Sequence, residues 1–555
     1  MQRQRMTGDM LGRVLVKMEF CSEQDIVEAL AVQAGMERVD ITKVKIKEEI
    51  LSQVSSDVAR FYNIIPVREK DGVLIVAMAD PLNIGLLDDL SQILGRPVQG
   101  AVSNPQDIQN SLKSNYAFET DSIQQNLQEL VDKVGDAALT MEELGQQEIV
   151  GDVDNLILLA QEPEVIKIVN LVLLDAVHKR ASDIHFEVYE DDFRIRLRVD
   201  GMLQEVVNPP KTQALALTSR VKIMSNMDIG ERRLPQDSRI ELKVGDSDID
   251  IRVSTLPTLY GECVVMRILD RTAVKVDLEK VGLDDEQLKS IRTIIHKPNG
   301  IFLVTGPTGS GKTTTLYACV NELNDPGVKI ITTEDPVELQ FDQVIQVHVK
   351  EEIGLTFAAC LRSILRQDPD IVMVGEIRDL ETAQIAVEAS LTGHIVLSTL
   401  HTNSAPESLT RLLDMGVEPF LITSSLAGVL AQRLVRILCR YCSQPYRPDA
   451  ELMEELALPK HWRDDPNLVL YKPGKCPACD FKGYKGRVGL FELMTVDEKV
   501  CDLILNGAMV HELRRYARRH LGMRTLREEG LMRAVKGLTS AEEVLTHTDK
   551  FEEDE

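Results

Sequence analysis

The sequence predicts an α/β protein of several domains, in which a glycine-rich loop follows a strand of a parallel sheet. At 555 residues the chain is longer than one hydrophobic core supports. The apolar, β-branched run Ile301–Thr305 is typical of a buried strand, and the residues that follow the loop, 314–320, can continue as a helix. Between residues 276 and 435 predicted strands and helices alternate, which is the pattern of a parallel sheet.

The loop at residues 306–313 reads GPTGSGKT, the signature of a P-loop. Its glycines let backbone N–H groups surround phosphate oxygens, and a helix that begins near Lys312 directs its positive end at the same anion. Lys312 can reach the β- and γ-phosphates, and the Thr313 hydroxyl can bind Mg²⁺. A chance glycine-rich turn would not bring strand, Lys and Thr into this register. We therefore predict a site for ATP and Mg²⁺ formed by Gly306, Pro307, Thr308, Gly309, Ser310, Gly311, Lys312, Thr313 and Thr314.

Composition limits where the protein acts and what it binds. The hydrophobic fraction of 44% is ordinary for a globular protein, and no apolar run approaches the roughly 20 residues that span a bilayer. No apolar signal segment follows the first residues, so we expect a cytoplasmic protein that reaches a membrane only through partners. The net charge of −25 argues against direct binding of nucleic acid, and nine cysteines are too few for a disulfide scaffold.

Changes in pattern along the chain divide it into six segments. In the segment 164–275, residues 193–199 alternate apolar residues with Arg, which predicts a strand with one basic face. Acidic residues dominate the segment 117–163, which can be interpreted either as a flexible connector or as a solvated helix face. The expected segments are a small α/β docking domain (1–116), an acidic linker (117–163), a PAS-like α/β domain (164–275), a RecA-like core (276–435), a tetracysteine insertion (436–490) and a helical C-terminal part with an acidic tail (491–555).

Carboxylates end two predicted strands of the core. Ligands bind at the carboxyl ends of strands in a parallel sheet, so Glu334 in the strand from Ile331 can face the γ-phosphate, although an acidic capping turn would look the same. Glu376 ends the apolar run from Asp370 and is the best candidate to orient or deprotonate the attacking water. Gly375 stands where an Asp is usual, which leaves open whether Glu376 binds Mg²⁺ directly or through water.

A third predicted strand, residues 393–402, carries a histidine near each end. His394 stands where a γ-phosphate sensor can be expected, and a packed, hydrogen-bonded histidine is the competing interpretation. His401 is the second candidate for the same role.

Two C-x-x-C pairs form the other chemical pattern of the sequence. Four thiolates at this spacing suit tetrahedral Zn²⁺ in a closed, structural site. A redox pair or four unrelated thiols are the alternatives. The predicted ligands are Cys439, Cys442, Cys476 and Cys479, whereas Cys21, Cys263, Cys319, Cys360 and Cys501 are expected to be ordinary packed residues.

Several short motifs occur in one order along the chain. After the P-loop come ITTEDPVE (331–338), DPDIVMVGEIRD (368–379) and TGHIVLSTLHTN (392–403). RASDIHFE (180–187) and RLPQDSRI (233–240) lie upstream, and GYKGRVGLFEL (483–493) lies downstream. Each string alone is weak, but together they resemble the secretion ATPase superfamily of type II secretion and type IV pilus assembly over nearly the whole chain.

The resemblance implies a hexameric ring that hydrolyses ATP to drive assembly of a pilin or pseudopilin fibre. Its partners would be an inner-membrane platform protein and the cytoplasmic adaptor of that protein. By matching position, Glu334 lies in an aspartate box and Glu376 is the catalytic glutamate. The resemblance also implies that nucleotide is contacted by Arg239, Arg252, Arg362, Arg366 and Arg487. The tetracysteine insertion and the N-terminal domain favour the extension or secretion branch over the retraction branch.

Three alternatives remain at the level of sequence. The segment from Leu11 to Gln33 resembles half of a cyclic-di-GMP-binding motif, but Met10 stands where Arg is expected and a Gly is absent near Glu19; a docking domain is the competing interpretation. A DNA-uptake or conjugation ATPase of the same superfamily is the second alternative. A nucleotide switch without turnover is the third, and the intact Lys312 and Glu376 argue against it.

Overall fold

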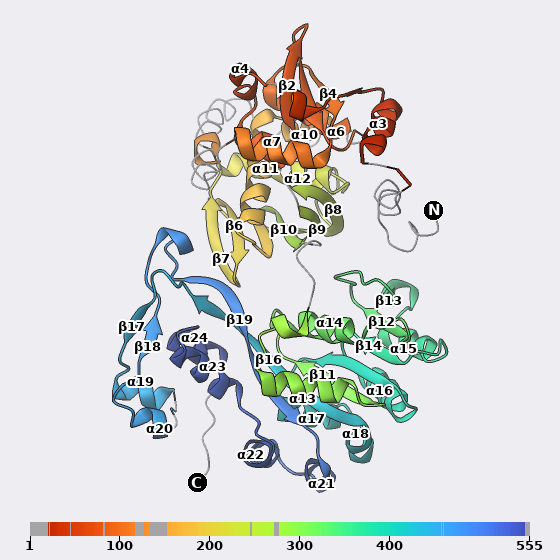
Figure 1. The fold of residues 1–555 in the computed structure, drawn as a ribbon, viewed down its shortest axis with the longest axis vertical. Coiled ribbons are helices and arrows are strands. Elements are labelled where there is room, and N and C mark those ends of the chain that lie inside the picture. The colour runs from red at the N-terminus through yellow and green to blue at the C-terminus, as the bar shows by residue number, and fades with distance from the viewer. Residues whose placement is uncertain are drawn as a thin grey trace. The chain divides into compact units, whose positions relative to one another are not determined.

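A computed structural model divides the chain into two units, Met1–Val274 and Lys275–Glu555 (Figure 1). It describes residues 20–549 except 22, 45, 82–83, 117–126, 132–152, 245–246, 271–276, 457 and 459. Most of the predicted acidic linker, the acidic tail and the Leu11–Glu19 part of the motif resembling a cyclic-di-GMP site lie outside the described residues. No helix among the described residues has the length and apolar character needed to cross a membrane.

The first unit begins with a four-stranded sheet in the order β1-β4-β3-β2. Its central strand β3 is the predicted apolar run and is almost completely buried. The strands are β1 (Glu37–Arg38), β2 (Ile65–Lys70), β3 (Val73–Met78) and β4 (Val98–Val102), and the helices are α3 (Glu23–Ala34), α4 (Glu48–Leu51), α5 (Ser56–Phe61), α6 (Ile84–Leu94) and α7 (Pro105–Asn115).

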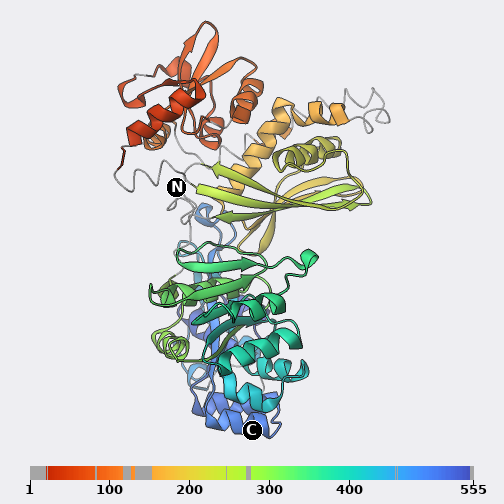
Figure 2. The same ribbon diagram turned by 90° about the vertical axis from the view of Figure 1, so that its right-hand side faces the viewer.

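A second, six-stranded antiparallel sheet follows in the same unit, in the order β7-β6-β5-β10-β9-β8. Helices α11 and α12 cover one of its faces (Figure 2). On β6 the apolar residues are buried and the arginines point to the other side, as the alternation predicts. The elements are α10 (Val153–Ala160), α11 (Pro163–His178), β5 (Asp183–Val188), β6 (Phe193–Val199), β7 (Met202–Val207), α12 (Ala214–Met224), β8 (Gln236–Val244), β9 (Ser247–Thr258) and β10 (Gly261–Asp270).

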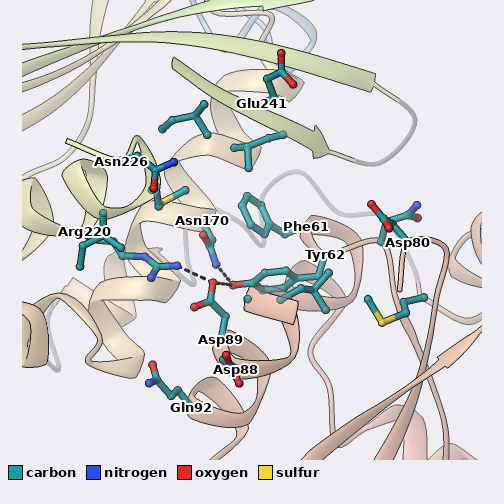
Figure 3. Close-up of a pocket in the computed structure, with 18 of the residues that line it drawn as sticks. Phe61, Tyr62, Asp80, Asp88, Asp89, Gln92, Asn170, Arg220, Asn226 and Glu241 are labelled. Carbon is teal, nitrogen blue, oxygen red and sulfur yellow. Dashed lines mark hydrogen bonds and ion pairs between the residues drawn. The ribbon is translucent and has the colours of Figure 1, made fainter. Parts of the chain in front are cut away.

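A buried contact joins the domain of the four-stranded sheet to the domain of the six-stranded sheet. Phe61 at the end of α5 packs into the core of the second domain. Beside it Asn170 donates to the Tyr62 hydroxyl (2.8 Å), which donates to Asp89 (3.1 Å), and Arg220 pairs with the same carboxylate at 2.7 Å (Figure 3). A cavity of about 740 Å³ lies next to this cluster, with lining residues from both domains. The two domains of this unit are therefore joined by packing and hydrogen bonds as well as by the chain.

The second unit is built on a seven-stranded sheet in the order β13-β12-β14-β15-β11-β16-β19. All strands run parallel except β19, which pairs antiparallel with β16. The strands alternate with helices along the chain, as predicted. The elements are α13 (Asp285–Ile295), β11 (Gly300–Thr305), α14 (Lys312–Leu323), β12 (Ile330–Glu334), β13 (Val344–His348), α15 (Phe357–Ile364), β14 (Ile371–Val374), α16 (Leu380–Leu391), β15 (Ile395–Leu400), α17 (Ala405–Asp414), α18 (Pro419–Ser425), β16 (Leu426–Leu438) and β19 (Tyr484–Thr495).

The cysteine-bearing segment lies between the ends of two long strands. β16 and β19 pair as far as Leu438 and Tyr484, so residues 439–483 leave and rejoin the main sheet at one place. This segment holds a two-stranded sheet and two short helices: β17 (Gln444–Tyr446), α19 (Ala450–Glu455), α20 (Lys460–Arg463) and β18 (Leu470–Lys472).

The described residues of the C-terminal part form four helices, which pack on β16, β19, α17 and α18. Asp497, Thr525 and Ser540 cap three of them, because each side chain accepts a backbone N–H of the first turn. The helices are α21 (Glu498–Leu505), α22 (Val510–His520), α23 (Leu526–Val535) and α24 (Ala541–His547).

Candidate nucleotide site and cysteine cluster

The P-loop connects β11 to α14 through a turn that only glycines fit. Gly309 and Gly311 have φ values of +80° and +89°. A Cβ on Gly306 would lie 2.5 Å from the Gln432 carbonyl oxygen, and one on Gly311 would lie 2.7 Å from the Gln432 amide nitrogen. The turn therefore requires glycine at these positions, both for backbone conformation and for the close approach of β16.

Lys312 lies inside this loop rather than in solvent. Its Nζ donates to the carbonyl oxygens of Gly306 (2.7 Å) and Pro307 (3.1 Å). Burial lowers the pKa of Lys312, the nearby Glu376 carboxylate raises it, and the Arg433 guanidinium lowers it. A phosphate group bound in the loop would add negative charge beside this amine and favour its charged form.

Glu376 follows β14 and lies beside His401, which follows β15. The His401 Nε2 and a Glu376 carboxylate oxygen are 3.0 Å apart, and Arg378 pairs with the other oxygen. In the sheet Val374 lies opposite Ser398, and Thr305 lies opposite Leu400, so β14, β15 and β11 end at one edge. The structure thus brings together Lys312, Glu376 and His401, as expected for ligands at the carboxyl ends of parallel strands.

The prediction that His394 senses the γ-phosphate is wrong. His394 precedes β15, and its backbone oxygen accepts the N–H of Gly300 at the start of β11. Its ring Nδ1 lies 2.7 Å from the Ala389 carbonyl oxygen, as a packed histidine would. Because β15 separates His394 from His401 by about 20 Å of extended chain, His394 is at the opposite edge of the sheet from the P-loop.

Glu334 ends β12 as predicted, but its carboxylate is engaged by neutral donors. It is 3% exposed and accepts hydrogen bonds from the Tyr317 hydroxyl, the Thr332 hydroxyl (2.5 Å) and the Gln346 amide (3.0 Å). Burial and the adjacent carboxylate raise the pKa of Tyr317. Since Tyr317 belongs to α14, the helix that begins at Lys312, Glu334 connects that helix to β12 and β13.

The predicted nucleotide-contacting arginines of the second unit are exposed. Arg362 pairs with Glu381, and Arg366 lies in the turn that leads into the amino end of β14, away from the edge that carries the P-loop of the same chain. Arg487 is on β19 opposite Arg436, beyond the point where β11 ends. Their roles toward nucleotide remain predictions.

Arg239 and Arg252 belong to the first unit, where they form a row with a third arginine. Arg239 on β8, Arg252 on β9 and Arg267 on β10 lie directly opposite one another in the antiparallel register. Side chains in such a register share one face of the sheet. The three line a surface cavity of about 520 Å³, and Arg267 also pairs with Asp183 at 3.0 Å. Arg267 belongs to none of the sequence motifs, and only the strand pairing reveals it as a member of the row.

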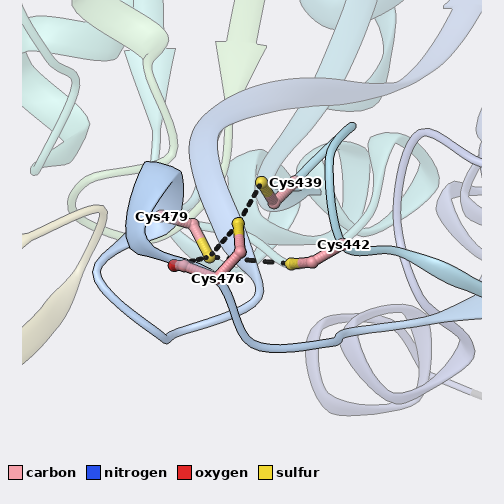
Figure 4. A group of neighbouring side chains, drawn as sticks. All are labelled: Cys439, Cys442, Cys476 and Cys479. Carbon is pink, nitrogen blue, oxygen red and sulfur yellow. Dashed lines mark hydrogen bonds between the residues drawn. The ribbon is translucent and has the colours of Figure 1, made fainter.

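The four predicted metal ligands converge (Figure 4). Their sulfur atoms all lie within 4.8 Å of one another, and three pairs are 3.7 Å apart. A tetrahedral Zn²⁺ with Zn–S bonds of about 2.3 Å would separate its sulfur ligands by about 3.8 Å. Although burial opposes ionisation of Cys479, hydrogen bonds with the backbone of Cys476 and Gly483 lower its pKa to about 6. The chemistry and spacing of these thiols fit a closed zinc site.

The string GYKGRVGLFEL also contains a buried carboxylate, Glu492, that was not among the predicted site residues. Glu492 is 0% exposed and accepts the backbone N–H groups of Ala405 (2.8 Å) and Leu526 (3.3 Å), the first residues of α17 and α23. Burial raises the pKa of Glu492 to about 7. Two half-buried arginines, Arg433 and Arg514, lie near it. Only the folded arrangement could reveal this group, because its other members lie 22 to 87 residues from Glu492 along the chain.

A strand, a phosphate-binding loop and a carboxylate at one edge of a parallel sheet define the core of a P-loop ATPase. Residues 159–546 match the family described as Type II/IV secretion system protein, so the chain belongs to this family, whose members are ATPases of the secretion ATPase superfamily. Residues 34–122 match the MshEN domain.

Two relatives match along nearly the full chain. The chain is 44% identical over 557 aligned residues to the type IV pilus assembly ATPase PilB of Myxococcus xanthus, covering 99% of this chain and 96% of the relative. It is 43% identical over 552 to the type II secretion system protein E of Xanthomonas campestris, with coverages of 99% and 94%. The ATPase DotB of Legionella pneumophila has a similar fold, with a TM-score of 0.51 at 23% identity over 68% of this chain and 94% of its own.

The raised pKa of Glu492 predicts a pH-dependent difference in stability. In the unfolded chain this carboxyl has its ordinary pKa of 4.5, whereas in the folded chain the pKa is about 7. Folding favours the protonated carboxyl. Its contribution to the free energy of unfolding is therefore complete below pH 4.5 and is lost as the pH rises through 7, a change on the order of 3 kcal/mol.

Because Glu492→Gln cannot ionise, the melting temperature of the wild type should fall by a few degrees relative to that of the variant between pH 5 and 8.5. Thermal unfolding of both chains across this range measures the difference. A constant offset at all pH values would contradict the assignment.

Proposed function

We propose that the protein is an ATP-hydrolysing motor that acts as a hexameric ring and powers assembly of a pilin or pseudopilin fibre. The two long relatives support this function through their names, a pilus assembly ATPase and a type II secretion protein E. The observation that carries it is the meeting of Lys312, Glu376 and His401 at one edge of the sheet. An inner-membrane platform protein and its adaptor would be the partners through which hydrolysis acts.

At this edge each residue has a distinct part in hydrolysis. Backbone N–H groups of the loop and Lys312 hold the β- and γ-phosphates. Thr313, exposed at the start of α14, would ligate Mg²⁺, which neutralises charge on the phosphates when bound. Glu376 orients the attacking water and accepts its proton, while His401 keeps the carboxylate facing the P-loop. A switch without turnover would need neither Glu376 nor its partner.

Two further predictions about ligands belong to this function. The cysteine cluster would hold one structural Zn²⁺ through Cys439, Cys442, Cys476 and Cys479, and its spacing supports this assignment. Binding of cyclic-di-GMP by the N-terminal domain stays a prediction, supported by the MshEN match but with part of its motif outside the described residues.

The role of Glu376 predicts a separation of binding from turnover. Glu376→Gln should slow steady-state ATP hydrolysis by about two to four orders of magnitude, the usual loss for a general base. Its affinity for ATP should change little, because phosphate contacts come from the loop, whereas Lys312→Ala should weaken binding itself. Turnover and nucleotide affinity are measured on both, with the exposed Glu388→Gln on α16 as a control. Near-wild-type turnover of the Glu376 variant would remove it from the base role.

The cysteine cluster predicts bound metal. One Zn²⁺ per chain should co-purify under reducing conditions, since structural zinc contributes about 10 kcal/mol to local folding. Cys476→Ser should lose the metal and destabilise residues 439–483 while ATP binding persists. Cys501→Ser, outside the cluster, is the matched control. Elemental analysis that finds no zinc in freshly purified, reduced protein would contradict the assignment.

The arginine row predicts catalysis across subunits. If Arg239 contacts the nucleotide of a neighbouring chain, Arg239→Ala should lower turnover on the order of 10³-fold, and activity should rise more than linearly with protein concentration. Arg194→Ala, an exposed arginine of the same sheet paired with Asp192, should leave turnover intact.

Mixing Arg239→Ala chains with Glu376→Gln chains should restore part of the activity, because some interfaces then combine an intact arginine with an intact glutamate. Mixed rings that form but never regain turnover would show that Arg239 does not act in trans.

A further inference from the structure

The loop of residues 401–404, here called the His401 loop, connects three parts of the nucleotide site. His401 contacts Glu376 at 3.0 Å. The Thr402 N–H donates to the hydroxyl of Thr305, the last residue of β11 before the P-loop, at 2.9 Å. The Thr305 hydroxyl lies within 3.1 Å of the Thr402 carbonyl oxygen as well. Movement of this loop would therefore move His401 relative to Glu376.

Two arginines hold the other side of the His401 loop. Arg433 on β16 donates to the Asn403 side-chain oxygen (3.0 Å), and its guanidinium lies beside Gly306. Arg514 on α22 donates to the Ser404 hydroxyl (3.1 Å) and lies 3.6 Å from Glu407 on α17. Arg514 thus connects a C-terminal helix directly to the loop that carries His401.

Glu492 on β19 also holds the His401 loop in place, through the residue that follows the loop. One carboxylate oxygen accepts the N–H of Ala405, the residue after the His401 loop, and the other accepts the N–H of Leu526. Both N–H groups belong to the first residue of a helix, where no intrahelical acceptor exists. A single buried carboxylate therefore fixes the start of α17 and the start of α23 relative to β19.

We propose that Glu492 and Arg514 are positioning residues for hydrolysis, which hold the His401 loop so that His401 keeps Glu376 directed at the nucleotide. The inference rests on the role proposed for Glu376. It also gives the C-terminal helices α22 and α23 a direct influence on turnover, since each contributes one of the contacts that fix the loop. Neither residue touches the P-loop itself, so nucleotide binding should be independent of both.

The test separates turnover from binding. Glu492→Gln keeps the size of the side chain but places an amide against one of the two N–H donors, and Arg514→Gln removes the charged donor to Ser404. Each should lower kcat by about 10- to 100-fold, the scale of small misplacements at a reacting centre, with the Kd for ATP within about twofold of the wild type. Arg514→Lys, which can still donate to Ser404, should recover part of the loss.

Matched controls come from the C-terminal helices α22 and α24. Glu543→Gln alters a buried carboxylate that binds Arg436, and Tyr516→Phe removes a contact from α22 to Asp497 on the loop before α21. Both should lower thermal stability while kcat at moderate temperature stays at the wild-type level. If Glu492→Gln does not fold, the Arg514 variants decide the question.

The outcomes are distinct. Wild-type kcat in folded Glu492→Gln and Arg514→Gln, with Glu376→Gln inactive, would overturn the positioning role and leave the proposed function standing. A parallel loss of ATP affinity would also overturn it, because the residues would then shape the P-loop. Full turnover of Glu376→Gln would overturn both.

Discussion

The parallel alignment of β11, β14 and β15 is the constraint on which the nucleotide site depends. Each strand ends at the same edge, so the P-loop, Glu376 and His401 follow three different strands and still meet. The strands are buried throughout, which favours one register, because a slip of one residue would bring side chains against closely packed neighbours of a different size and shape. The packing of the apolar strands thus determines the relative positions of the P-loop, Glu376 and His401.

Buried carboxylates then bind the surrounding helices to this edge. Glu334 is linked to α14 through the Tyr317 hydroxyl, and Glu492 accepts the first N–H groups of α17 and α23. Unlike an ion pair in solvent, a buried carboxylate must have donors for its oxygens, so each one specifies a single arrangement of the elements around it. Removing such a group would affect both the position of a helix and the stability of the unit.

Local sequence patterns predicted those parts of the sites whose functional residues lie within a few positions of one another or of a recognisable strand. The P-loop, Glu376 and the cysteine pairs were predicted from spacing and from the character of adjacent strands. His394 and His401 illustrate the limit: both flank one strand, and only the direction of β15 in the sheet decides which one faces the P-loop. Glu492, Arg433 and Arg514 could not be predicted, because no local pattern joins residues that meet only through strand pairing and helix packing.

The arrangement of charge supports the proposal that hydrolysis uses cations of a neighbouring chain. Lys312 is largely buried in its own loop, and within the second unit Arg433 is occupied by Asn403 beside Gly306. Arg239, Arg252 and Arg267 instead concentrate positive charge on one face of the other unit's sheet. Arg267 already pairs with Asp183, and an anion that approaches the row would further offset the repulsion among its three like charges. In the proposed ring, a triphosphate held by the P-loop of a neighbouring chain would be an anion of this kind, and its binding would couple ring formation to hydrolysis.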